Sequence, residues 1–167
     1  NINFWGVVHG TQAFLPHLKA TRDGHVVNIS SVFGLVSIPS QSAYNAAKFA
    51  VRGFTDALRI ELDVERGGVS STTVHPGGIK TNIVRNMRSD ENNPFERPGT
   101  DPVSGFDRIA RTTPEQAAKE ILAAVKSNRR RALIGVDANV IDFLSRLPLS
   151  AFHRALSLGA RLGRRRR

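Results

Sequence analysis

The sequence predicts an α/β fold in which a parallel sheet carries helices on both faces. Helical and strand-like patterns alternate along the chain, and each pair of strand patterns is separated by a segment long enough for a crossover helix. The chain also starts at Asn1 rather than Met, directly in a strongly apolar segment. We therefore expect the sheet to be incomplete at the N-terminus.

The first expected elements are a helix at 2–19 and a strand at 25–30. Apolar residues at positions 4, 7, 8, 14, 15 and 18 indicate the helix, and Gly6 and Gly10 on one face allow a neighbour to approach closely. The segment TRDG then has the composition of a turn. The run HVVNIS that follows is short, apolar and β-branched, which is typical of a buried parallel strand.

A long helix is predicted at 42–65, because apolar residues cover two of its faces. Alanines widen the main stripe, which consists of Ala47, Val51, Phe54, Leu58 and Leu62. Such a helix buries one face on the sheet and the other on a further helix or on a second subunit. We expect a homo-oligomer formed through helices 2–19 and 42–65. Gly67 and Gly68 are expected to end the helix, and a strand at 69–75 leads into a Pro-Gly loop.

Residues 82–112 are rich in Asn, Pro, Gly and charge, so an irregular lid, binding loop or disordered segment is expected there. Thr113, Pro114 and Gln116 then form a strong helix start with a capping box. A short strand is expected within 129–138, followed by an amphipathic helix at 139–163 that Pro148 interrupts. We expect residues 1–138 to belong to one domain and residues 139–167 to form a C-terminal helical extension with a basic tail.

Composition excludes several classes of protein. The chain has no cysteine, which removes disulfides and thiol chemistry and fits a cytoplasmic location, and its five histidines lack metal-ligand spacing, so no metal is expected. No apolar run is long enough to span a bilayer, which needs about 18 residues, and residues 1–20 do not resemble a signal peptide.

The net charge of +10 is concentrated near the C-terminus, since residues 143–167 hold seven arginines and no acidic residue. A solvated tail explains this run, and peripheral contact with anionic lipid is an alternative. Nucleic-acid binding is not expected, because aromatic residues are sparse and no nucleic-acid-binding motif is present.

Polar residues with chemical potential follow the predicted strands. Ser30 and Ser31 end the first strand, and the helix that begins beside that strand end carries Tyr44 and Lys48 one turn apart. Ligands of parallel α/β sheets bind beyond the carboxyl ends of the strands. A tyrosine has an ordinary pKa of about 10, and a lysine cation one turn away favours the phenolate that accepts a proton. The Tyr–Lys pair is therefore a candidate for acid–base chemistry.

Four motifs in order resemble the short-chain dehydrogenase/reductase family. They are INFWG with Asn3, VVNISSVFG with Ser31 thirteen positions before the tyrosine, YNAAK, and HPGGIKTN with Thr81. The chain resembles the C-terminal two-thirds of such an enzyme, which implies a Rossmann-like fold and hydride transfer between NAD or NADP and an alcohol or carbonyl substrate. Beyond residue 110 the resemblance is mainly one of layout.

The resemblance also implies roles for these residues. Tyr44 would be the proton acceptor or donor, Ser31 would bind the substrate oxygen, and Lys48 would bind the nicotinamide ribose. Asn3 would position a water that links the lysine to solvent. The cofactor-binding residues would be Tyr44, Lys48, Pro76, Gly77, Ile79 and Thr81, and the substrate-binding residues Ser31 and Tyr44.

Some neighbouring residues have a structural reading instead. Ser30 is a rival to Ser31 and is expected to cap the strand end, Asn28 to brace the backbone, and His75 to be a strand-end residue. Phe33, Met87 and Phe95 are candidates for lining an apolar substrate pocket, with core or loop packing as the alternative.

No Gly-rich phosphate loop of the kind that binds a dinucleotide occurs in this sequence. We therefore expect this chain alone to be inactive, and the choice between NAD and NADP stays open. An alternative to the enzyme is a non-catalytic fragment or interaction protein that keeps the helical association surface but not cofactor binding.

Overall fold

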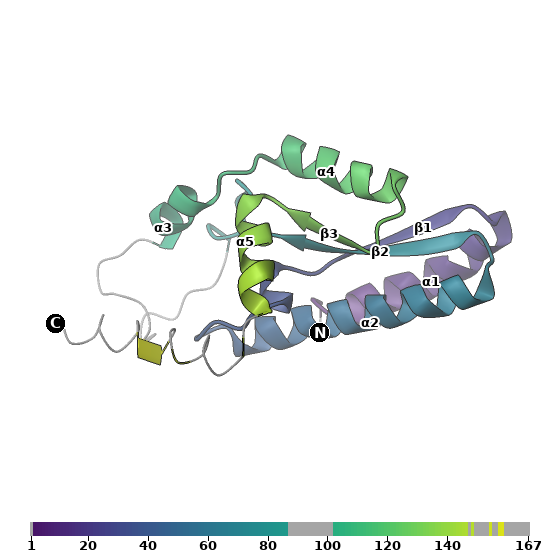
Figure 1. Cartoon of the computed structure of the whole chain (residues 1–167), viewed down its shortest axis with the longest axis horizontal. Coiled ribbons are helices and arrows are strands. Elements are labelled where there is room, and N and C mark those ends of the chain that lie inside the picture. The colour runs from purple at the N-terminus through teal and green to yellow at the C-terminus, as the bar shows by residue number, and fades with distance from the viewer. Residues whose placement is uncertain (1, 87–101, 147, 149–153, 155–156, 159–167) are drawn as a thin grey trace.

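The structure is a computed structural model that describes residues 2–86, 102–146, 148, 154, 157 and 158 (Figure 1). The elements in chain order are α1 Trp5–Thr21, β1 Gly24–Ile29, the 3-10 turn η1 Val32–Gly34, α2 Ser42–Glu65, β2 Val69–Pro76, α3 Pro102–Ile109, α4 Pro114–Lys126, β3 Arg131–Ile134 and α5 Val136–Ser145.

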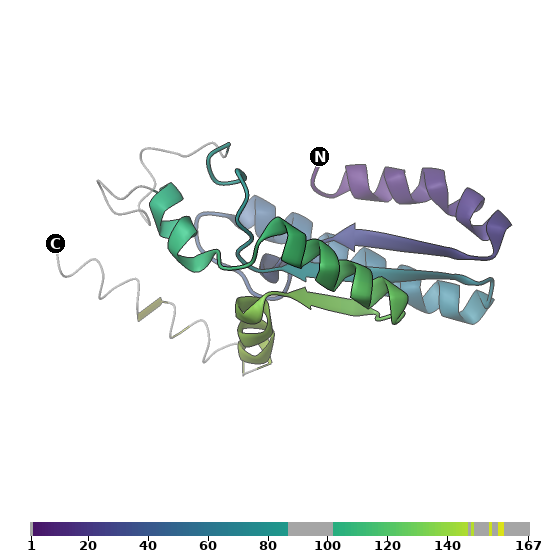
Figure 2. The ribbon, with the colours of Figure 1, turned by 90° about the horizontal axis from the view of Figure 1, so that it is seen from above.

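The described strands form one parallel sheet in the order β1-β2-β3, which confirms the predicted parallel pairing. Helices α1 and α2 lie on one face and α4 on the other (Figure 1). Seen from above, α1 runs beside β1 at one edge, while α4 covers β2 and β3 (Figure 2). Helices α3 and α5 lie near the carboxyl end of the sheet, together with the N-terminal end of α2 (Figure 1). The sheet has helices on both faces, as the sequence predicts.

Two apolar clusters hold these layers together. On the α4 side, Val74 of β2 packs against alanines of α4 and against Ile134 of β3. On the α2 side, Leu58 and Leu62 pack against β1 and β2. Both clusters meet at β2, so the middle strand carries the core.

Helix α2 has the predicted bounds, but its end is built differently from the prediction. The residue with left-handed backbone geometry is Arg66, with φ 51°, rather than Gly67. Gly68 has φ 79°, and a β-carbon there would collide with the carbonyl of Arg22 at the end of α1. This glycine is therefore needed for the approach of two chain segments, not for ending the helix.

One other expectation is wrong, and two further elements differ in extent from the sequence pattern. Residues 102–109 form helix α3, although the polar composition of 82–112 predicted an irregular segment, and residues 87–101 lie outside the described residues. The short strand expected within 129–138 is present as Arg131–Ile134, and it ends there because Gly135 has φ 91° and turns the chain into α5. Helix α5 ends before Pro148, and it spans the boundary expected after residue 138. That division stays a prediction, because most of 139–167 lies outside the described residues.

The capping box predicted for α4 is present. The Thr113 hydroxyl accepts a hydrogen bond from the Gln116 N–H at 3.2 Å, and the Gln116 side chain accepts one from the Thr113 N–H at 3.0 Å. Local sequence alone specifies this feature, since both partners lie within one turn.

Gly34 generates the first prediction, because a β-carbon there would lie 2.8 Å from the carbonyl oxygen of Lys48 and would collide with the Ser30 hydroxyl. Replacing Gly34 by Ala should lower the free energy of unfolding by about 1–3 kcal/mol, as for other overpacked sites. Gly105→Ala is the control, because that helical glycine has open space around it and should be neutral or stabilising. Urea unfolding of the complete protein measures both, and equal stabilities of the two variants would contradict the prediction.

His75 generates the second prediction. Its side chain is fully buried, Nδ1 lies 2.9 Å from the carbonyl oxygen of Ser31, and Nε2 has no partner within the part of the chain described. Burial lowers the pKa of His75 below its ordinary 6.5, and the hydrogen bond to Ser31 opposes this only in part. Below pH 6.5 the unfolded chain therefore takes up the proton first, so stability is full above that pH and falls as the pH decreases.

Melting temperatures of the complete protein should accordingly fall from about pH 6.5 to about pH 5. His75→Asn keeps an N–H donor for Ser31 but does not titrate, so its melting temperature should change less over this range. The pKa of His25 is also lowered, by burial and then by Arg59, so His25→Asn is measured in parallel. An unchanged pH slope in both variants would refute this assignment.

Candidate functional site

Tyr44 and Lys48 lie side by side at the start of α2. The lysine Nζ is 5.6 Å from the centroid of the tyrosine ring, and both side chains are half-buried. Spacing i,i+4 on a helix places both on the same side, which explains why the sequence predicts the pair.

The ammonium of Lys48 donates a hydrogen bond to the carbonyl oxygen of Ile29 at 3.0 Å. Burial lowers the pKa of Lys48 from its ordinary value, because the cation loses solvation. Since an ammonium has three donors, two remain for other partners. The lysine therefore connects the end of β1 to the tyrosine and keeps capacity for a ligand.

The two serines after β1 have different hydrogen bonds. The Ser30 hydroxyl is buried and donates to the carbonyl oxygen of Lys48 at 2.8 Å. The Ser31 hydroxyl accepts a bond from the Phe33 N–H at 3.1 Å and caps η1. The proton of Ser30 is thus committed, whereas Ser31 only accepts. This difference favours Ser31 as the serine that can donate to a ligand.

Phe33 and Asn45 hold the surroundings of the tyrosine. The rings of Phe33 and Tyr44 meet edge to face with centroids 6.3 Å apart. The side-chain amide of Asn45 is buried and donates to the carbonyl oxygen of Ile38 at 2.8 Å, which ties the preceding loop to α2. Met87 and Phe95, the other candidates for an apolar pocket, lie outside the described residues.

The loop after β2 lies at the same end of the sheet. The imidazole of His75, the residue before Pro76, donates to the carbonyl oxygen of Ser31 and so joins the carboxyl ends of β1 and β2. The Gly77 N–H donates to the carbonyl oxygen of Ile134 at 3.0 Å, and Ile79 pairs with Thr112 in a parallel bridge. Thr81 is exposed. The loop is thus fixed to β1 and β3.

Asn3 is not brought into this group. It lies in the turn before α1 with an exposed side chain, and none of the hydrogen bonds of the described residues joins it to Lys48. Asn28 is buried, and its side-chain amide donates to the Thr55 hydroxyl at 3.1 Å and the Thr11 hydroxyl at 3.4 Å. Asn28 therefore braces side chains of α1 and α2, where the sequence predicted that it would brace the backbone.

Sequence reasoning missed Asp137. This residue is in the first turn of α5, and its carboxylate accepts a hydrogen bond from the Gly78 N–H at 2.6 Å. The two residues are 59 positions apart, and no motif connects them. Only the placement of α5 at the end of β3 brings them together.

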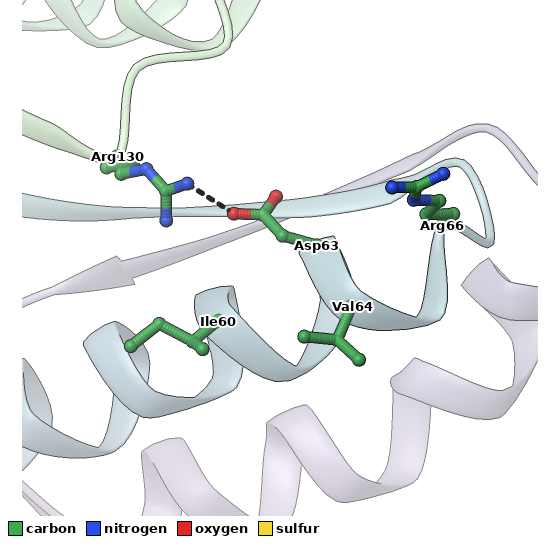
Figure 3. Close-up of a pocket in the computed structure, with 5 residues that line it drawn as sticks. All are labelled: Ile60, Asp63, Val64, Arg66 and Arg130. Atoms are coloured by element: carbon green, nitrogen blue, oxygen red, sulfur yellow. Dashed lines mark ion pairs between the residues drawn. The ribbon is translucent and has the colours of Figure 1, made fainter.

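A surface depression elsewhere is lined by Ile60, Asp63, Val64, Arg66 and Arg130 (Figure 3). An ion pair of 2.6 Å joins Asp63 to Arg130 across it. Ile60 is four helical turns from Tyr44, about 24 Å along α2. This depression is therefore separate from the site built around the tyrosine.

Within the described ranges there is no group of three or more His, Cys, Asp or Glu side chains that could hold a metal ion. Within the same ranges, none of the helices combines the length and the apolar character needed to cross a membrane.

Comparison with known proteins identifies the family. Residues 1–92 match the family model described as short chain dehydrogenase. The chain is 48% identical over 163 residues to "Putative oxidoreductase SadH" of Mycobacterium tuberculosis strain H37Rv, covering 95% of this chain and 56% of that protein. It is 35% identical over 160 residues to "Dehydrogenase/reductase SDR family member 7B" of Xenopus laevis, covering 95% of this chain and 47% of the relative. The chain thus spans about half the length of the curated relatives that it matches.

Solved structures show the same similarity. A short chain dehydrogenase from Burkholderia cenocepacia in complex with NADP aligns with a TM-score of 0.71 at 25% identity, over 93% of this chain and 56% of that one. A short chain dehydrogenase/reductase from Burkholderia phymatum in complex with NAD aligns with a TM-score of 0.62 at 26% identity, over 77% of this chain and 49% of that one. With a family model that covers more than half of the sequence, the chain belongs to the short-chain dehydrogenase family.

Proposed function

We propose that the complete protein is an oxidoreductase that transfers a hydride between NAD or NADP and an alcohol or carbonyl substrate. The observation that carries this proposal is the Tyr44–Lys48 pair, whose lysine is bound to Ile29 at the end of β1, two residues before Ser31. Of the two similar solved structures, one contains NADP and the other NAD. This supports a nicotinamide dinucleotide as the cofactor and leaves the choice between the two open.

In the proposed mechanism Tyr44 moves a proton. Its phenol takes the hydroxyl proton of an alcohol during oxidation, or donates it to a carbonyl oxygen during reduction. The cationic Lys48, 5.6 Å from the ring centroid, stabilises the phenolate form by charge. The Ser31 hydroxyl donates to the same substrate oxygen, where negative charge develops. Phe33 packs edge to face on the tyrosine ring and restricts its orientation.

The donor set fits the nicotinamide end of a dinucleotide. The Tyr44 phenol makes no hydrogen bond within the described part of the chain, and Lys48 has two donors beyond the one used on Ile29. The bound cofactor supplies or accepts the hydride. We propose that Lys48 holds its ribose and that Pro76, Gly77, Ile79 and Thr81 line its nicotinamide.

Two parts of the proposal rest on the sequence. The role proposed for Asn3 in positioning a water rests on its motif alone, because its side chain is exposed. The sequence also has no Gly-rich phosphate loop, so we propose that this chain alone is inactive. The absence of cysteine is compatible with a reducing cytoplasm, which we propose as the location.

Removing the phenol tests the proposed chemistry. Tyr44→Phe in the complete protein should lower kcat by about 10²–10⁴-fold, because the ring stays and the transferable proton is lost. Affinity for NADPH or NADH, measured by fluorescence titration, should stay nearly the same. A panel of alcohols and ketones with both cofactors gives the substrate for the assay.

Ile38→Val, in the same region but with no group able to transfer a proton, is the control and should keep its activity. A Tyr44→Phe protein with the activity of the wild type would contradict the mechanism.

We further propose that α1 and α2 form a contact with a second copy of the chain. Ile60 and Val64 of α2 are 60% and 77% exposed, and Phe14 of α1 is 68% exposed. Figure 3 shows Ile60 and Val64 on neighbouring turns of α2. Such apolar side chains, on two helices that cover the same face of the sheet, favour burial against a like surface. The same surface would serve the alternative function, a non-catalytic interaction protein.

The double substitution Ile60→Asp and Val64→Asp should dissociate the proposed homo-oligomer, because it places four carboxylates on a twofold contact. Light scattering coupled to size exclusion measures the mass. Leu122→Asp is the control, since Leu122 is 58% exposed on α4, on the opposite face of the sheet. A wild-type protein that is monomeric, or a double variant that keeps its mass, would refute this contact.

Peripheral contact of residues 143–167 with anionic lipid stays a prediction from charge, since most of that segment lies outside the described residues.

A further inference from the structure

We infer that Asp137 is a positioning residue that fixes the Gly77–Gly78 turn, and with it the loop to which the proposed function assigns the nicotinamide. The expected effect on cofactor binding rests on the proposed function, whereas the contact between Asp137 and Gly78 does not. The Asp137 carboxylate accepts a hydrogen bond from the Gly78 N–H at 2.6 Å, in a half-buried position. A bond from a backbone amide to a charged acceptor is stronger than one between neutral groups.

Two glycines leave the space that this carboxylate fills. A β-carbon on Gly77, after β2, would collide with the carboxylate of Asp137. A β-carbon on Gly135, after β3, would lie 2.7 Å from Asp137 Oδ1 and 2.7 Å from the Thr112 hydroxyl oxygen. Chain segments from two different strands are therefore shaped around the same acidic side chain.

The turn that precedes Asp137 is held in place from α4 and α5. The Gly135 N–H donates to Glu120 at 3.2 Å, and the Gly135 carbonyl accepts from the Asn139 side chain at 2.9 Å. These bonds fix the turn from which α5 starts, and Asp137 lies in the first turn of that helix. A carboxylate in this position often serves only the N-terminus of its own helix, but here its hydrogen bond goes to another element.

The residues after the turn are bound by a second tie. The Lys80 N–H donates to the carbonyl oxygen of Thr112 at 2.9 Å, beside the bridge between Ile79 and Thr112. Asp137 and Thr112 thus hold the turn and the segment after it. Loss of the Asp137 bond would release the Gly78 amide, while Gly77 stays bound to the Ile134 carbonyl oxygen and the bridge at Ile79 remains. The expected result is a loop that binds the cofactor more weakly, with the Tyr44 proton transfer intact once the cofactor is bound.

Amide exchange tests the contact without any assumption about activity. In the complete protein labelled with [15N]glycine, Asp137→Ala should speed exchange of the Gly78 amide by about tenfold or more, as expected for loss of a hydrogen bond to a charged group. Asp137→Asn keeps an oxygen acceptor and should recover most of the protection. Glu115→Ala is the matched control, because Glu115 is also a first-turn acid, on α4, and should leave Gly78 unchanged. Unchanged Gly78 exchange in a folded Asp137→Ala protein overturns the inference.

Steady-state kinetics tests the positioning role. Asp137→Ala should raise KM for the dinucleotide by about tenfold, with kcat at saturating cofactor changed by less than about threefold, and Asp137→Asn should lie between it and the wild type. A fall in kcat with unchanged KM overturns the role. If the wild-type protein binds neither NAD(H) nor NADP(H), the proposed function fails, and the cofactor role fails with it, while the exchange result still decides the contact.

A double-mutant comparison keeps the inference testable if Asp137→Ala is poorly folded. Gly77→Ala should lower the melting temperature more in the wild type than in an Asp137→Gly background, because the added methyl group then meets no carboxylate. Equal losses in both backgrounds overturn the inference.

Discussion

β2 is the middle strand of the described sheet, and from Ser71 to His75 its side chains are fully buried although four of the five are polar. A buried polar group without a partner is strongly destabilising, so each neighbouring element has to supply a hydrogen bond at a fixed position. Helix α2 supplies Asp56 for Thr73 and Arg59 for the carbonyl of Ser71, the segment before β3 supplies the carbonyl of Arg129 for Thr72, and the end of β1 supplies the carbonyl of Ser31 for His75. These bonds fix the rotation of α2 about its axis and the register of both outer strands. The position of α2, which carries Tyr44, and of Ser31, whose carbonyl is bound by His75, therefore depends on β2.

Local spacing explains what could be predicted from the sequence. Helix 42–65, the capping box at Thr113 and the Tyr44–Lys48 pair all depend on residues within one or two helical turns, and their patterns are complete in the sequence. The parallel sheet follows from the alternation of elements. Helix α3 was not predicted because the segment around it is rich in charged residues and the helix contains Gly105. Both features weaken the sequence pattern by which a short amphipathic helix is recognised.

The contact of Asp137 could not be predicted from the sequence. It depends on the direction in which the chain leaves β3 to start α5, and on two glycines, Gly77 and Gly135, that are far apart in sequence and leave room for the carboxylate. Glycines at 77 and 135 are ambiguous in a sequence, because turn geometry, close packing and ligand approach all select glycine. At position 77 the structure gives close packing as a sufficient reason. The Pro-Gly motif can therefore be recognised from neighbouring residues, but the reason for glycine at position 77 is a contact with Asp137, which is distant in sequence.

Lys48 is bound to the end of β1 in both directions. Its backbone carbonyl accepts the Ser30 hydroxyl at 2.8 Å, and its ammonium donates to the carbonyl of Ile29 at 3.0 Å. These two bonds join the first turns of α2 to the end of β1 directly, independently of the loop that connects them. The turnover of a Lys48 variant therefore reflects two separate effects of the substitution. A substitution at 48 removes a charge and a mechanical link at once, and a loss of turnover there measures their sum, whereas the phenolic oxygen of Tyr44 is free of such links to the rest of the described chain.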